Sequence, residues 1–161
     1  MRSFSPAAAG RSLDRADVAV DAIFGTGFRG TPEGAFAEAI QSLNEAGALV
    51  VAVDIPSGVN GETGSVEGEA VWAEATVALG AEKVGTVLPP GADRAGFVEV
   101  ADIGYPRDLI HGDIGLVESL DVATRLPPRE TDTHKRATGV VLVVGGSREM
   151  TGAMRLVGTA A

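Results

Sequence analysis

Two residues near the middle of the chain have types and positions that could do chemistry. Asp54 follows the apolar run 48–53 and comes immediately before the turn Ile55-Pro56-Ser57-Gly58. In open α/β sheets, ligands bind outside the carboxyl ends of the strands. A carboxylate at that point, beside the hydroxyl of Ser57, is therefore a candidate for proton transfer. The alternative is an aspartate that only hydrogen-bonds to its own turn.

A second carboxylate, Asp21, lies inside the apolar segment Val18–Phe24, which predicts a strand. Burying a carboxylate is costly unless it is paired, hydrogen-bonded or bound to a cation. Asp21 is therefore the second candidate for a functional residue. The alternative is that Asp21 stands at the end of the strand and meets water.

A glycine-rich segment, 25–30, separates this strand from a predicted helix and matches the pattern G-x-G-x-x-G. Its amides, the helix N-terminus and the Arg29 guanidinium could together bind a phosphate. In dinucleotide-binding proteins the helix begins within this pattern, but here Thr31 and Pro32 predict a helix that starts after the last glycine. Both a phosphate-binding loop and a glycine turn without a ligand remain open.

The elements that must position these residues follow from the apolar pattern. The run 48–53 predicts a strand buried on both faces, as in a parallel sheet. Phe36, Ile40 and Leu43 give the helix between the first two strands one apolar face, and Gly47 ends it. Further along, we expect a loop at 59–71, strands at 76–79 and 97–100, a linker at 107–137, a buried strand at 140–144 and a helix from Thr151 to Ala161.

Composition excludes several classes of function. The net charge of −9 argues against a nucleic-acid partner, because phosphate backbones need basic surfaces. The chain has no cysteine, which excludes disulfides and thiolate chemistry. No apolar run approaches the roughly 20 residues that span a bilayer, and the first residues do not resemble a secretory signal. We therefore expect no membrane partner and a cytoplasmic location.

Two sets of motifs carry a resemblance to known families. The segments 21–27, 54–58, 76–80, 83–85 and 102–106 resemble the later half of the NAD(P)H-hydrate epimerase domain. The segments 134–135, 139–147 and 152–153 resemble the opening of the ADP/ATP-dependent NAD(P)H-hydrate dehydratase domain. The two occur in the order found in the bifunctional NAD(P)H-hydrate repair family. This resemblance implies an α/β fold with a partial Rossmann-like, three-layer parallel sheet at 16–106, a linker at 107–137, and the first strand and helix of a ribokinase-like domain at 138–161.

The resemblance also implies an activity and a set of site residues. The epimerase interconverts the R and S forms of hydrated NADH and NADPH, and the dehydratase removes water from the S form using ADP or ATP. By matching position, Asp21 and Ser57 would hold a potassium ion, and Asp54 would contact the hydrated nicotinamide as the catalytic residue. Ala153 would contact substrate in the dehydratase part, and we allow for a homo-oligomer. The residues that would bind the substrate's phosphates are Gly25, Thr26, Gly27, Phe28, Arg29, Gly30 and Thr31.

The sequence also departs from the family pattern. An Asn/Gly/Asp-rich loop that precedes this region in the family has no counterpart, and most of the dehydratase domain is absent. Arg136 replaces a small residue, and His134 fits a solvated linker better than a catalytic role. We therefore expect a piece of a longer protein that is poorly stable and inactive alone. The competing functions are a non-catalytic nucleotide or phosphate binder and an NAD-dependent oxidoreductase.

Overall fold

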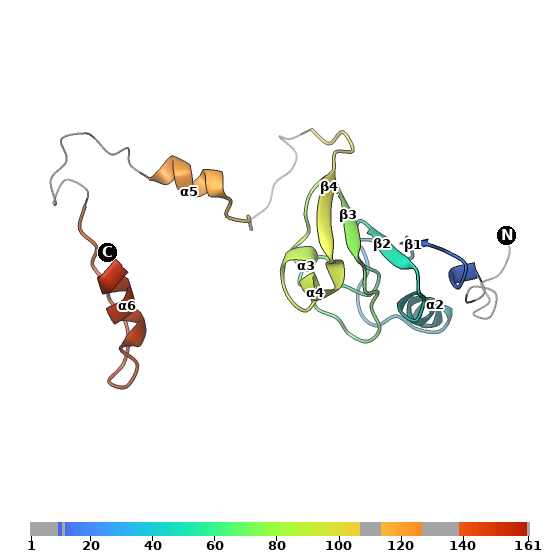
Figure 1. Ribbon diagram of the computed structural model, residues 1–161, viewed down its shortest axis with the longest axis horizontal. Coiled ribbons are helices and arrows are strands. Elements are labelled where there is room, and N and C mark those ends of the chain that lie inside the picture. The colour runs from blue at the N-terminus through green and yellow to red at the C-terminus, as the bar shows by residue number, and fades with distance from the viewer. Residues whose placement is uncertain (1–9, 11, 107–113, 127–138, 161) are drawn as a thin grey trace. The chain divides into compact units, whose positions relative to one another are not determined.

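The computed structural model describes residues 10, 12–106, 114–126 and 139–160, and it divides the chain into two units (Figure 1). The first unit is Met1–Ile114 and the second is Gly115–Ala161. Each unit is described here by itself.

The first unit is built on a parallel sheet of four strands. These are β1 (Val18–Asp21), β2 (Leu49–Val53), β3 (Ala75–Leu79) and β4 (Phe97–Ala101). They lie side by side in the order β1-β2-β3-β4, and every pair is parallel (Figure 1). Because all the carboxyl ends point the same way, the loops after the strands meet at one edge. The predicted α/β class with a parallel sheet is confirmed.

β1 is shorter than the sequence indicated, because it ends at Asp21 and not at Phe24. The Asp21 carboxylate accepts a hydrogen bond from the Ile23 amide, 3.2 Å away, which turns the chain at that point. Asp21 thus stands at the end of the strand, as the alternative to a functional role proposed. It does not meet water, however, because it is fully buried.

The sheet has one covered face and one open face. Alternate side chains of the strands, including Ala19, Val50 and Ala52, are buried under the helices and the loop 59–71. On the other face Leu49 is 57% exposed and Phe97 is 70% exposed. The prediction that 48–53 is buried on both faces is therefore wrong for the described residues. Side chains alternate between the faces of a strand, so one apolar run supplies both the buried and the exposed side chains of β2.

The crossover helix α2 (Ala35–Asn44) packs on the covered face through Ile40 and Leu43, as predicted, whereas Phe36 is 54% exposed. The helix ends at Asn44 and not at Gly47, which was predicted to end it. Its start was predicted wrongly, because Thr31 does not cap it. The N-cap residue is Gly34, whose φ of 56° is a backbone conformation that glycine adopts readily. The helix therefore begins several residues beyond the glycine loop.

Two short helices that the sequence analysis did not predict follow β3. They are α3 (Val84–Val87) and α4 (Ala92–Ala95). Ala95 is fully buried, and its carbonyl accepts a hydrogen bond of 2.7 Å from the Thr76 hydroxyl on β3. This contact places α4 on the covered face of the sheet. The preceding segment 59–71 is a loop, as predicted, with one isolated bridge between Val59 and Val66.

The second unit holds two helices among its described residues, α5 (Ser119–Arg125) and α6 (Gly152–Ala160). α6 agrees with the helix predicted from Thr151, whereas α5 lies in the segment taken as a linker. The predicted strand at 140–144 is wrong, because no described residue pairs with it, and Val140 is 86% exposed. A strand needs a neighbour for its backbone hydrogen bonds. None of the described helices is long and apolar enough to cross a membrane.

Candidate active site

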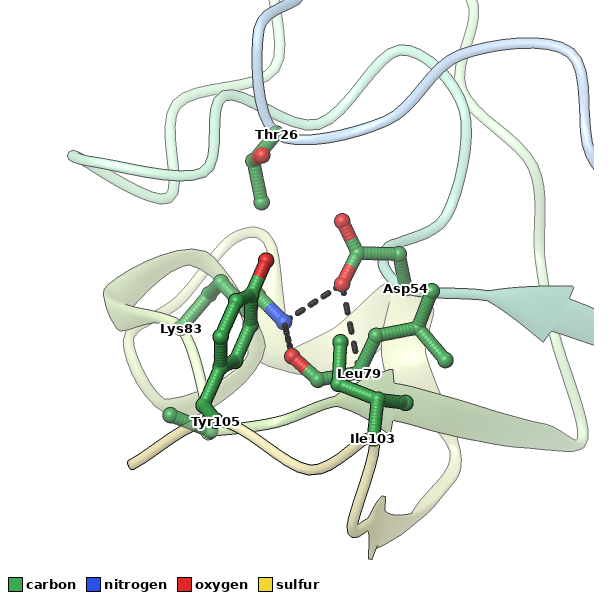
Figure 2. A pocket seen from close by; sticks show the side chains of 7 residues that line it. Thr26, Asp54, Leu79, Lys83, Ile103 and Tyr105 are labelled. Carbon is green, nitrogen blue, oxygen red and sulfur yellow. Dashed lines mark hydrogen bonds and ion pairs between the residues drawn. The ribbon is translucent and has the colours of Figure 1, made fainter. Parts of the chain in front are cut away.

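The carboxyl edge of the sheet carries a cavity of about 500 Å³ (Figure 2). Residues from four loops that are distant in sequence line it: Thr26, Asp54, Leu79, Ala81, Lys83, Ile103 and Tyr105. Thr26 follows β1, Asp54 follows β2, Leu79 is the last residue of β3, and the others follow β3 or β4. Asp54 and the glycine loop, through Thr26, therefore line the same cavity.

An ion pair between Asp54 and Lys83 is the polar centre of this cavity. The Lys83 ammonium group donates a hydrogen bond to Asp54 Oδ1 and a second one, of 2.8 Å, to the Leu79 carbonyl (Figure 2). The Leu79 amide also donates to Asp54 Oδ1, at 3.2 Å. The two charged side chains are only 16% and 17% exposed. β3 and the loop after it thus hold the Asp54 carboxylate. The alternative, in which Asp54 only hydrogen-bonds to its own turn, does not describe these contacts.

The backbone of Asp54 is in an unusual conformation. Its φ is 73°, and it is the one non-glycine residue with a positive φ in the described part of the chain. Its amide donates to the Val77 carbonyl at 2.8 Å, and the Ile55 amide donates to the Val53 carbonyl at 2.9 Å. Asp and Asn tolerate this region better than other non-glycine residues, and strained residues gather at functional sites. The turn therefore aims the carboxylate out of the strand and into the cavity.

The glycine loop approaches Asp54 from β1. A Cβ at Gly25 would lie 3.6 Å from Asp54 Oδ2, which puts the loop backbone beside the carboxylate. Among the described residues, the hydrogen bonds to this carboxylate all reach Oδ1. Oδ2 therefore faces the loop and the open cavity. Thr26 is the loop residue that lines the cavity.

The other loop residues have different surroundings. Phe28 stacks on Phe24 with ring centroids 4.3 Å apart, and Phe24 also contacts Phe36 of α2. The Arg29 guanidinium donates to the carbonyls of Thr26 and Phe28, both at 2.8 Å, and forms an ion pair with Glu62. Gly27, Gly30 and Thr31 lie along the same loop outside the cavity lining. Aromatic packing and the arginine thus fix the shape of the loop.

Asp21 and Ser57 form a buried pair beneath the site. Asp21 is fully buried and Ser57 is 1% exposed. The Ser57 hydroxyl donates to Asp21 Oδ1 at 2.7 Å, and the Ser57 amide donates to Oδ2 at 2.8 Å. The Phe24 amide in turn donates to the Ser57 hydroxyl at 2.9 Å. This network ties the Pro-Ser-Gly turn after Asp54 to the start of the glycine loop.

Sequence reasoning missed Lys83 and Tyr105 as site residues. Lys83 is one of only two lysines in the chain, and it follows the carboxyl end of a strand. Tyr105 is the only tyrosine and follows the next strand. In both cases a rare residue type soon after a predicted strand was a signal that could have identified the site residue. Ala153 lies on α6 in the second unit, and His134 lies outside the described residues, so their predicted roles stay predictions.

The chain is similar to a known family and to several known proteins. Residues 2–85 match the family described as YjeF-related protein N-terminus. Over 137 residues the chain is 47% identical to the bifunctional NAD(P)H-hydrate repair enzyme Nnr of Thermofilum pendens, a match that covers 85% of this chain and 26% of the relative. The same enzyme of Moorella thermoacetica is 45% identical over 149 residues, covering 91% of this chain and 28% of the relative.

A shorter relative matches the first part of the chain. The NAD(P)H-hydrate epimerase of Levilactobacillus brevis is 45% identical over 96 residues, which cover 59% of this chain and 45% of the relative. The chain thus spans about a quarter of the length of the repair enzymes and under half of the epimerase. The family match covers more than half of the chain, so the chain belongs to the YjeF-related protein N-terminus family.

Proposed function

We propose that this chain carries the nucleotide-binding and acid–base part of an NAD(P)H-hydrate epimerase. The observation that carries the proposal is the Asp54–Lys83 ion pair, which faces the glycine loop across one cavity at the carboxyl edge of a parallel sheet. Relatives named as hydrate epimerase and hydrate repair enzyme match over this region. The substrate would be a nicotinamide nucleotide in which water has added to the ring.

The ion pair suits the chemistry of such an epimerisation. The two forms differ at the carbon that bears the hydroxyl, next to the ring nitrogen. If the pair gives its proton to that hydroxyl, water leaves while the nitrogen lone pair forms a C=N⁺ bond. Water then adds to the opposite face and returns a proton to the pair. Asp54 Oδ2 is the oxygen that faces the cavity and could reach the hydroxyl.

The test is to incubate the 161-residue chain with purified R-NADH hydrate and follow the S form by chromatography. We expect the S form to appear faster than in protein-free buffer, because the ion pair and the glycine loop already meet at one cavity. This proposal replaces the expectation from the sequence that the chain is inactive alone. Binding of the hydrate without any increase in rate would instead favour the non-catalytic nucleotide binder. An NAD-dependent oxidoreductase is disfavoured by α2, since it begins at Ala35, well after the last glycine of the loop.

In this proposal the glycine loop binds the substrate's phosphates, and Glu62 competes with them for Arg29. We expect Glu62→Gln to tighten the binding of ADP-ribose about two- to fivefold, because an exposed ion pair contributes little and its loss frees the guanidinium. Isothermal titration at low and high salt measures this change, and the gain should shrink as salt screens the charges. Weaker binding by Glu62→Gln would mean that the pair only shapes the loop.

A potassium ion at Asp21 and Ser57 remains part of the proposal. Asp21 Oδ2 accepts one hydrogen bond from the protein, and the Ser57 hydroxyl oxygen also accepts one. Each oxygen therefore retains a lone pair, and oxygen ligands suit a hard cation. The described residues contain no cluster of three or more His, Cys, Asp or Glu, so further ligands would be carbonyls or water. When bound, the ion would offset the charge of Asp21.

Thermal melting distinguishes an ion site from a purely structural pair. We expect potassium chloride to raise the melting temperature of the chain above its value in choline chloride at equal ionic strength. A ligand at a hundred times its Kd stabilises a fold by about 2.7 kcal/mol. Asp21→Asn should abolish this potassium-dependent difference. Equal melting temperatures in both salts would show that Asp21 and Ser57 hold the turn without an ion.

The later part of the chain supports a second proposal, which concerns the domain to which the second unit belongs. The matches to the two repair enzymes cover 85% and 91% of this chain, so they extend well beyond the 59% matched by the epimerase. We therefore propose that the second unit belongs to the start of a hydrate dehydratase, which would use ADP or ATP. Ala153 would contact the substrate there.

A further inference from the structure

We infer that Tyr105 is a specificity-determining residue whose ring stacks on the hydrated nicotinamide ring of the substrate. This inference rests on the proposed function, because it places that ring between Tyr105 and the Asp54–Lys83 pair. Figure 2 shows Tyr105 and Lys83 among the side chains that line the cavity. The proposed chemistry needs a group that holds the ring in this position, and none of the polar residues supplies one.

The lining of the cavity combines polar and apolar side chains. Thr26, Asp54 and Lys83 provide a hydroxyl, a carboxylate and an ammonium group. The remaining lining residues are Leu79, Ala81, Ile103 and Tyr105, whose side chains are largely apolar. A ring with apolar faces and a hydroxyl at its edge fits such a lining. Its hydroxyl can meet Asp54 while one face lies on the aromatic ring.

The backbone immediately after β3, the strand next to β4, holds the ring of Tyr105 in place. Gly80, with a φ of 75°, passes so close that a Cβ there would lie 2.5 Å from Tyr105 Cδ2 and 2.9 Å from Cε2. The Gly80 amide donates to the Ala101 carbonyl at 2.8 Å, which extends the β3–β4 pairing to this point. The tyrosine ring is thus supported by the backbone of Gly80.

The turn after β4 brings Tyr105 back to the cavity. The Gly104 amide donates to Asp102 Oδ1 at 2.8 Å, and Gly104 has a φ of 80°. Tyr105 is nevertheless 59% exposed, although aromatic side chains gain most from full burial. A large, exposed ring that the backbone supports and that lines a cavity is arranged to contact a ligand.

The chain offers a direct test because Tyr105 is its only tyrosine. With ¹³C-labelled tyrosine, the ring gives one set of NMR signals, whose shifts report a stacked partner. We expect saturable shifts on titration with NADH hydrate and none with ADP-ribose, which lacks the nicotinamide-derived ring. Shifts with ADP-ribose of the same size would place the adenine on Tyr105 and overturn the inference. Unmoved signals with NADH hydrate would overturn it as well.

Variants separate stacking from a general structural role. Tyr105→Leu should raise the KM for the hydrate about 5- to 100-fold with little change in kcat, because aromatic stacking is lost. Tyr105→Phe keeps the ring and should stay within about threefold of the parent chain. A KM for Tyr105→Leu equal to that of Tyr105→Phe would contradict stacking. If epimerisation occurs without tyrosine shifts, only this inference fails; if shifts occur without epimerisation, the proposed enzyme activity fails.

Discussion

Asp54→Asn is expected to lower the rate of hydrate epimerisation about 100- to 10,000-fold, the usual cost of losing a positioned acid or base. The asparagine keeps the shape of the side chain but cannot exchange a proton in the same way. It also tolerates the positive φ of this position, so the turn should keep its conformation. The measurement is the initial rate of conversion of R- to S-NADH hydrate by chromatography.

A matched control separates this effect from a general loss of negative charge. Asp93→Asn makes the same chemical change at an exposed residue of α4 and should leave the rate unchanged. Binding of ADP-ribose should persist in both variants, because neither residue belongs to the glycine loop. Full epimerase activity in Asp54→Asn would remove Asp54 from the chemistry.

Gly58→Ala is expected to destabilise the first unit by about 3 kcal/mol or more, which is a large part of the 5–15 kcal/mol typical of a folded domain. Gly58 has a φ of 96°, which strains any residue with a side chain. A Cβ there would also lie 2.7 Å from Ala70 Cα and even closer to the Glu69 carbonyl oxygen. Both contacts are with backbone, which cannot move aside cheaply. Denaturant unfolding measures the change in free energy.

Gly27→Ala provides the comparison for Gly58→Ala. Gly27 lies in the glycine loop, and a Cβ there would meet no atom within 4 Å. We therefore expect its unfolding free energy to stay within about 0.5 kcal/mol of the parent chain. Equal stability of the two variants would show that the turn after Asp54 can relax around a side chain. The restraint that the turn places on Asp54 would then be weaker than the structure indicates.

The sheet and the location of the site could be predicted from the sequence, since both depend on local patterns. An apolar run followed by an aspartate and a Pro-Ser-Gly turn marks the carboxyl end of a buried strand. The partner of Asp54 could not be found in this way. Lys83 reaches it only because β2 and β3 are neighbours, and no spacing along the chain specifies that contact.

Three features of the fold differ from the sequence-based predictions for specific physical reasons. β1 ends early because the Asp21 side chain, in place of a neighbouring strand, accepts the hydrogen bond of the Ile23 amide. Threonine is a common N-cap residue, which is why Thr31 was predicted to start the helix, but Gly34 adopts the backbone conformation from which α2 begins. The apolar residues 140–144 predicted a strand, but apolar character alone supplies no hydrogen-bonding neighbour.

The order of the strands has a consequence for how the site is completed during synthesis. Each strand pairs with the one made just before it, as in Val18 with Leu49, Val51 with Ala75 and Ala75 with Phe97. A chain leaving the ribosome therefore finds a partner for each new strand already present, and no strand has to wait for one made later. The buried pair Asp21–Ser57 can form first and the Asp54–Lys83 pair next. Tyr105, which follows β4, takes its place in the cavity lining last. The cavity becomes able to hold a ring only after the charged groups beneath it are in place.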